Sequence, residues 1–222
     1  EYQIEAELLH TFLHNGARSP AYPSIVGGGA NSCILHYVEN QDVLKDGDLL
    51  LIDAGAEYDC YASDITRTFP VNGKFTKDQA AVYEVVLEAQ LAAIAQVQPG
   101  NTWNMPHEAA VDVITRGLVD IGILKGRLAK LIRDEAYRPY YMHKTGHWLG
   151  MDVHDVGDYK VADEWRTFES GMVTTVEPGI YLASNIKGLA KRWWNIGVRI
   201  EDDVLVTKTG HEVLSANAPK QV

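Results

Sequence analysis

The sequence predicts an α+β fold in which helices cover a curved, largely antiparallel sheet. Two observations lead to this prediction. Strand patterns, helix patterns and then strand patterns again follow one another along the chain, and such segregation is typical of α+β architectures. The strand patterns at both ends of this order carry acidic residues. We therefore also expect an internal pseudo-twofold relation between two similar halves.

The first half contains one helix and two strands by pattern. Residues 1–15 carry apolar side chains at helical spacing and are closed by Gly16. The glycines at 27–29 predict a turn or loop, without the residues that a phosphate-binding loop needs. Residues 47–55 predict a buried strand, and residues 61–71 predict its partner across a polar turn.

The middle of the chain predicts helices. Thr76 is followed three positions later by Gln79, which is the spacing of a capping box at a helix start. This helix is expected to run to Pro99 and Gly100. The remaining predicted elements are helices at about 106–121 and near 128–136, and strands at 172–182 and 195–207.

Composition narrows the class of protein. The formal net charge of −10 opposes a phosphate backbone, so we expect no nucleic-acid partner. No apolar run approaches the roughly 20 residues that span a bilayer, so no membrane segment is predicted. The first residues are acidic where a signal peptide would be basic. Cys33 and Cys60 are the only cysteines, which favours a reducing, cytoplasmic location and predicts two small buried side chains.

The chain is predicted to form one domain over residues 1–222, because no Pro- and Gly-rich linker and no short repeat divides it. It opens with Glu1 inside a helical pattern and not with Met. We therefore expect that an upstream segment, including the start of the first helix, is absent from this sequence.

Carboxylates inside buried strand patterns point to function. Asp53 ends an apolar run, Glu177 follows another, and Glu201 lies within VRIEDDVLV. A lone buried charge is costly unless it is paired or binds a metal. On an extended strand Asp64 shares a face with two threonines, and Arg199 shares one with Glu201. The alternative is that these acids are salt-bridge partners or lie on an exposed strand face.

A histidine-rich segment favours the metal interpretation. Residues 142–157 read MHKTGHWLGMDVHDVG and contain His143, His147 and His154 between glycines. A single histidine is usually structural, but this cluster in a chain with buried acids predicts a ligand and groups that handle protons. The candidate ligands are Asp53, Asp64, His147, Glu177 and Glu201. Such an oxygen-rich set suits manganese, cobalt, magnesium or iron better than structural zinc, and two close ions can activate water.

Four segments resemble the Xaa-Pro aminopeptidases, also called aminopeptidase P. They read LLIDAGAEYDCYASDITRTFPVNGKF, HWLGMDVHDVG, TVEPGIY and GVRIEDDVLVT. These enzymes belong to the pita-bread metallopeptidases, together with methionine aminopeptidase and prolidase. The resemblance covers nearly the whole chain. It implies the pita-bread fold and a manganese-dependent enzyme that removes the first residue of peptides whose second residue is proline.

The resemblance also implies a role for each ligand. Asp53 would bind one metal ion, and His147 and Glu177 would bind the other. Asp64 and Glu201 would bridge the two ions. Glu177 would also take the proton from the attacking water molecule.

Further residues match groups that act on the substrate in this family. His36, His143 and His154 would position the substrate and stabilise the charge that develops on its carbonyl group. Arg199 would pair with the ligand carboxylates. Lys144 stands where a glycine is common in the family, and its effect is not predicted.

The family resemblance implies a preceding domain and a homo-oligomeric full-length protein. We expect lower activity from a chain that lacks that domain. Trp193 and Trp194 are interpreted either as a substrate or subunit contact or as the anchor of a surface loop.

Two alternative functions stay open. A prolidase would cut only Xaa-Pro dipeptides with the same ligands, although Trp148 and Leu149 after His147 favour the aminopeptidase. A pita-bread protein without metals could serve as a binding module, but all five candidate ligands are present.

Overall fold

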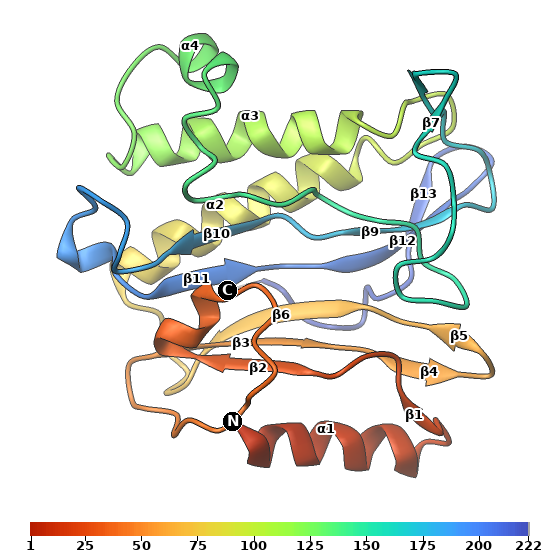
Figure 1. The fold of residues 1–222 in the computed structure, drawn as a ribbon, viewed down its shortest axis with the longest axis horizontal. Coiled ribbons are helices and arrows are strands. Elements are labelled where there is room, and N and C mark those ends of the chain that lie inside the picture. Colours follow the sequence, from red (N-terminus) through yellow and green to blue (C-terminus); the bar gives the residue numbers. More distant parts are fainter. Residues whose placement is uncertain (222) are drawn as a thin grey trace.

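Two antiparallel sheets lie side by side at the centre of the fold (Figure 1). The computed structural model describes residues 1–221. One sheet has the order β2-β3-β6 and the other the order β13-β12-β9. Their strands are β2 (Ile25–Gly28), β3 (Leu49–Ala54), β6 (Ile65–Pro70), β9 (Val173–Val176), β12 (Asp202–Val206) and β13 (His211–Val213). The backbone N–H of Glu201 donates to the carbonyl oxygen of Thr66 at 3.1 Å and joins the two sheets.

Smaller strand pairs extend this centre. A second antiparallel pair, β10 with β11, continues the C-terminal half beyond β9 and β12. The remaining short elements are β1 (Ser19–Pro20), β4 (Ala56–Tyr58), β5 (Tyr61–Ala62), β7 (Lys160–Val161), β8 (Glu164–Trp165), β10 (Gly179–Leu182), β11 (Ile196–Arg199), and the 3-10 turns η1 (Gly29–Cys33) and η2 (Lys191–Trp193). The predicted antiparallel, curved arrangement is therefore confirmed.

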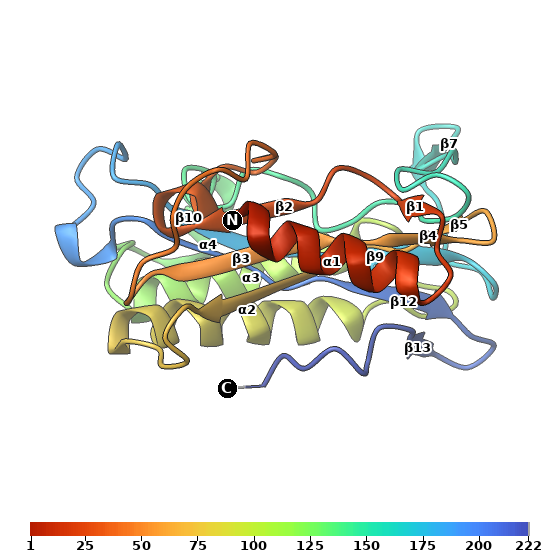
Figure 2. The ribbon, with the colours of Figure 1, turned by 90° about the horizontal axis from the view of Figure 1, so that it is seen from below.

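Two long helices cover one face of the strands (Figure 2). They are α2 (Lys77–Ile94) and α3 (Met105–Asp120), while α1 (Tyr2–His14) lies beside β1 and β2 and α4 (Leu128–Arg133) follows α3. The predicted capping box is confirmed, because the Thr76 hydroxyl accepts from the Gln79 N–H at 3.2 Å and the Gln79 side chain accepts from the Thr76 N–H at 2.9 Å. Gly117 lets α2 and α3 approach closely, since a Cβ there would lie 2.4 Å from Val85.

The core lies between these helices and the strands. Val86 of α2, Ile114 and Leu118 of α3, and Val204 of β12 are all fully buried. Burial of apolar surface contributes ~25 cal/mol per Å², so this layer stabilises the packing of the helices on the strands. The opposite face of the strands is left for the polar residues described below. Within residues 1–221 no helix has the length and apolar character needed to cross a membrane.

Both long predicted strands of the C-terminal half are interrupted at a carboxylate. The predicted strand at 172–182 divides at Glu177 and Pro178 into β9 and β10, because proline has no N–H to give to a sheet ladder. The predicted strand at 195–207 divides before Asp202 into β11 and β12. These interruptions place Glu177 and Glu201 at strand ends.

Two local predictions are wrong. Gly27 and Gly28 lie in β2 and pair with Leu51 and Leu50 of β3, not in a loop. A Cβ on Gly27 would lie 2.9 Å from the carbonyl oxygen of Asn31, so a close approach of η1 requires glycine here. Cys60 is exposed at a turn with a φ of 65°, whereas Cys33 is partly buried.

Candidate metal centre

Each half of the sheet supplies two acidic residues to the junction between the halves. Asp53 lies in β3, and Asp64 immediately precedes β6. Glu177 immediately follows β9, and Glu201 immediately precedes β12. The two antiparallel strand pairs thus place carboxylates at equivalent ends, as the predicted internal twofold requires.

His147 reaches the same point from a segment beside β9. The His147 carbonyl oxygen accepts from the Thr175 N–H at 3.0 Å, which fixes this segment against the strand. Gly146 is required there, since a Cβ would lie 2.1 Å from the Thr175 carbonyl oxygen. Nδ1 of His147 lies 3.0 Å from the Trp148 carbonyl oxygen. This contact places the ring proton on Nδ1 and leaves Nε2 to face the carboxylates.

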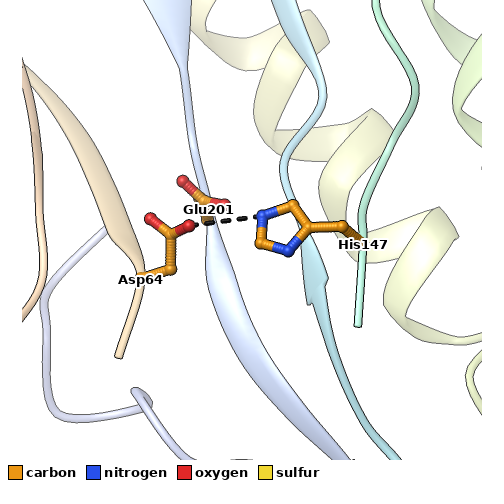
Figure 3. A group of neighbouring side chains, drawn as sticks. All are labelled: Asp64, His147 and Glu201. Atoms are coloured by element: carbon orange, nitrogen blue, oxygen red, sulfur yellow. Dashed lines mark ion pairs between the residues drawn. The ribbon is translucent and has the colours of Figure 1, made fainter. Parts of the chain in front are cut away.

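Three of the side chains form a group that matches the dimensions of a metal shell (Figure 3). One ligand atom each from Asp64, His147 and Glu201 lies within 4.8 Å of the others. Nε2 of His147 is 3.3 Å from Oδ2 of Asp64 and 3.7 Å from Oε1 of Glu177. Adjacent ligands about 2.1 Å from one octahedral ion are roughly 3 Å apart, so these atoms need to move little to share an ion.

All the candidate residues from the sequence line one cleft of about 270 Å³. They are His36, Asp53, Asp64, His143, His147, His154, Glu177, Arg199 and Glu201. Lys144 lines the same cleft. The predicted set is therefore brought together in space, and the role of each member is treated as a proposal below.

The charges of the cleft are unbalanced. Burial raises the pKa of Asp53, raises the pKa of Glu177 to about 7, and raises the pKa of Glu201 well above its ordinary range. Arg199 is buried and forms an ion pair with Asp53 at 2.6 Å, which partly opposes this effect. Burial lowers the pKa of His147, but Asp64 and Glu177 outweigh burial and raise it. Buried acids in this number require more positive charge than one guanidinium supplies, and divalent cations fit that requirement.

His143 is held by a chain of hydrogen bonds with a defined direction. Arg199 can only donate, so Tyr181 Oη accepts from its Nη1 at 3.0 Å and donates its own proton to Nε2 of His143 at 2.8 Å. Nδ1 of His143 then donates to the Lys144 carbonyl oxygen at 2.7 Å. Burial, followed by the charge of Arg199, lowers the pKa of His143 to about 3. The ring is therefore neutral with both nitrogens engaged.

Two further side chains, which the sequence did not assign to the site, contact the acidic residues of the cleft. Tyr22 Oη lies 2.5 Å from a carboxylate oxygen of both Asp53 and Asp64. Burial and then these two carboxylates raise the pKa of Tyr22 well above its ordinary value, so it stays a phenol that donates. The Thr66 hydroxyl donates to Oε2 of Glu201 at 2.6 Å. Tyr22 lies in a loop between β1 and β2, and only its folded position reveals it.

The two neighbouring tryptophans have different positions. Trp193 is 4% exposed and belongs to the core, so its interpretation as a hydrophobic anchor is supported. Trp194 is 39% exposed, and its Nε1 donates to the Leu189 carbonyl oxygen at 3.0 Å.

Comparison with known proteins identifies the family. The model of metallopeptidase family M24 matches residues 1–208. The chain belongs to metallopeptidase family M24. Aminopeptidase PepP of Pseudomonas aeruginosa has the same fold, with a TM-score of 0.98 and 60% sequence identity over 99% of this chain and 50% of that one. This M24 chain therefore has the pita-bread fold that the sequence motifs predict.

Two curated relatives of this M24 chain are named Xaa-Pro aminopeptidase. The Xaa-Pro aminopeptidase of Haemophilus influenzae is 53% identical over 100% of this chain and 51% of its own length. The Xaa-Pro aminopeptidase of Escherichia coli is 50% identical over 100% of this chain and 50% of its own length. The chain thus spans about half the length of the curated relatives that it matches. A variant of aminopeptidase P from Escherichia coli in complex with substrate has a TM-score of 0.96 and 49% identity over 100% of this chain and 50% of that one.

Proposed function

We propose that this M24 chain is the catalytic part of a manganese-dependent aminopeptidase that cleaves an N-terminal residue from a following proline. The observation that carries the proposal is the convergence of four carboxylates and one imidazole in a single cleft. It is supported by relatives that are named Xaa-Pro aminopeptidase and are 50% and 53% identical to this chain.

The donor set fits two divalent cations. Asp53 would hold one of them, His147 and Glu177 would hold the other, and Asp64 and Glu201 would contact both. Four carboxylates and one imidazole favour manganese over structural zinc. Bound there, the two ions would supply the positive charge that lowers the pKa of a water molecule and polarises a carbonyl group.

Glu177 is the proposed proton acceptor of the reaction. In the metal-free chain burial raises the pKa of its carboxyl group to about 7, and bound cations would lower it, so that Glu177 would be ionised and able to accept a proton at neutral pH. Glu177 would take a proton from the attacking water and deliver it to the leaving proline nitrogen. Oε2 of Glu177 lies 3.7 Å from Nδ1 of His143, so the neutral His143 ring bounds the space around this carboxylate.

His36 and His154 are the proposed contacts to the substrate. Both side chains are exposed and line the cleft. Burial and then the nearby His147 lower the pKa of His154, so its ring is a neutral N–H donor at pH 7. Such a donor can stabilise the negative charge that grows on the scissile carbonyl oxygen. His143 has both nitrogens engaged within the protein, and it therefore orients Tyr181 and Arg199 in this proposal.

The proposed function is tested with matched peptides. The manganese-loaded chain is incubated with Xaa-Pro-Yaa, Xaa-Ala-Yaa and Xaa-Pro, and the free first residue is quantified. We expect release from Xaa-Pro-Yaa, because proline lacks an N–H and has a fixed φ that a dedicated cleft can select. Release only from Xaa-Pro would indicate a prolidase. No release from any peptide, with manganese bound, would contradict the proposed activity of this chain.

Metal should stabilise the fold more strongly as the pH rises. Without metal the folded chain keeps a proton on Glu177 up to about pH 7, whereas an unfolded glutamate releases it near 4.5. The folded state then binds more protons than the unfolded state, so the stability of the metal-free chain falls as the pH rises through this window. Manganese needs the ionised carboxylates and binds more tightly over the same window.

The expected result is a gap in melting temperature between manganese-loaded and chelated protein that widens from about pH 5.5 to about pH 7.5. At a free metal concentration of about 100 Kd the stabilisation is about 2.7 kcal/mol. For a chain of this size that corresponds to roughly 5–10 °C. The gap is measured by thermal unfolding at both pH values, and an equal gap at both would contradict the proposed coupling.

A further inference from the structure

A hydroxyl group behind the cleft is held from two sides. The Thr145 hydroxyl lies 2.8 Å from Nδ1 of His107 on α3 and 2.5 Å from the Tyr141 hydroxyl. Thr145 is 3% exposed and lies between His143 and His147 in the sequence. His107 is separated from Thr145 by 38 positions, so the contact ties a helix of the covering layer to the segment that carries two histidines of the cleft.

This contact leads directly to the proposed proton acceptor. The carbonyl oxygen of Thr145 accepts from the backbone N–H of Glu177 at 2.7 Å. Tyr141 also meets the ring of His143 edge-on, with ring centroids 5.0 Å apart. The position of the Thr145 backbone therefore affects where both Glu177 and His143 sit.

His107 has the chemistry of a fixed hydrogen-bonding group. The ring is partly buried, and burial and then the positive charge of Lys144 lower its pKa to about 4. It is therefore neutral from pH 6 upward, and Nδ1 can either donate to or accept from the Thr145 hydroxyl. His107 lies outside the residues that line the catalytic cleft, so it has no direct contact with the reacting groups.

We propose that His107 is a positioning residue, which holds the Thr145 hydroxyl and thereby fixes the backbone of Glu177 in the cleft. Its effect on turnover rests on the proposed function. Its effect on the Glu177 backbone does not rest on that function, because the hydrogen bond between the Glu177 N–H and the Thr145 carbonyl oxygen exists independently of any reaction.

The structure also offers a direct route to restore the contact. His107 and Thr145 both line a separate cavity of about 460 Å³, beside the cleft. Removal of the imidazole in a His107→Ala variant would enlarge a space that is already wide enough for a small ring. Free imidazole can therefore enter from this cavity and replace the lost hydrogen bond to Thr145.

The first experiment compares variants with the unaltered chain. A hydrogen bond contributes about 1 kcal/mol, so His107→Leu and Thr145→Val should each lower kcat about 5- to 10-fold and leave KM within about 2-fold. His107→Asn should keep most of kcat, because its amide nitrogen stands as far from Cβ as Nδ1 does. Thr115→Val is the matched control, since it removes a buried hydroxyl of α3 that donates to the Val111 carbonyl oxygen in its own helix.

The second experiment does not depend on activity. Amide hydrogen exchange is followed by NMR in the metal-free chain. In His107→Leu the Glu177 amide should exchange about 5-fold faster, while the amide of Leu51 in the β2-β3 ladder keeps its rate. Addition of imidazole to His107→Ala should slow the exchange of the Glu177 amide again. It should also raise the ratio of the variant's kcat to the kcat of the unaltered chain measured in the same buffer. The double variant His107→Ala/Thr145→Val should not respond.

The exchange rates test the positioning role of His107, and the release of the first residue tests the proposed function. Unchanged exchange at Glu177 in His107→Leu would overturn the positioning role, whatever the activity. Faster exchange at all amides alike would also overturn it, since that pattern indicates global destabilisation. Faster exchange at Glu177 in a chain that releases no residue from Xaa-Pro-Yaa would support positioning and reject the proposed function.

Discussion

Glu201→Gln is expected to abolish turnover and to weaken manganese binding at least ~100-fold, because loss of a charged contact of about 3 kcal/mol corresponds to that factor. Glu201 is 2% exposed and belongs to the group of ligand atoms with Asp64 and His147. Asp64→Asn should behave in the same way, since both carboxylates are proposed to contact both ions. Metal affinity is measured by calorimetric titration, and turnover with Xaa-Pro-Yaa.

The same variant should gain stability when metal is absent. The pKa of Glu201 is raised well above its ordinary range by burial and then by Asp64, so its ionised form is unfavourable in the folded chain. A neutral glutamine removes that cost, and the chelated Glu201→Gln variant should melt no lower than the unaltered chain. Loss of affinity with a lowered melting temperature would instead indicate a damaged fold.

Two control variants distinguish the proposed ligands from residues that are not expected to bind metal. His154→Ala should keep manganese affinity within about 3-fold and lower kcat by about 100-fold, as expected of a group that acts on the substrate. Glu212→Gln, an exposed carboxylate on β13, should change neither quantity. If His154→Ala lost its metal, the proposed role of His154 would be wrong.

The second large effect concerns stability. Asp202 is fully buried next to Glu201, and its carboxylate accepts from Arg67 at 2.7 Å, from Gln90 at 2.7 Å and from Ser215 at 2.6 Å. Lys220 forms a further ion pair with it. Asp202→Ala should lower the free energy of unfolding by about 3–5 kcal/mol, because it leaves the buried guanidinium of Arg67 without its partner.

This loss is measured by urea unfolding of the metal-free chain. Asp112→Ala is the matched control, because Asp112 pairs with Arg116 on the exposed face of α3. That pair should contribute less than about 0.5 kcal/mol. A loss below about 1 kcal/mol for Asp202→Ala would show that water or a shifted side chain satisfies Arg67 instead.

Local features of the sequence predicted most of the fold. The capping box of Thr76 and Gln79 depends on neighbouring residues only, and the structure confirms it. The apolar run before Asp53 predicted β3 for the same reason. Gly27 and Gly28 were wrongly predicted as loop, because the close approach of η1 that needs glycine in β2 is not a local property.

The candidate site, like the fold, could be predicted from the sequence only in part. The acids at strand ends and the histidine-rich segment are visible in the sequence, and all of them line one cleft. Their roles as ligands remain predictions. Tyr22 and His107 could not be found, because each contacts the site through a partner more than 30 positions away. A pairing of that kind depends on how strands and helices pack.

The hydrogen bond from Glu201 to Thr66, across the two halves of the sheet, has a consequence for the order of folding events. Residues 53 and 64 belong to one half and residues 147, 177 and 201 to the other, so the complete ligand set exists only after the halves have docked. The chain must therefore close long loops, at a cost in conformational entropy, before the site can bind a cation. Manganese should therefore slow unfolding strongly and leave the refolding rate nearly unchanged in stopped-flow measurements.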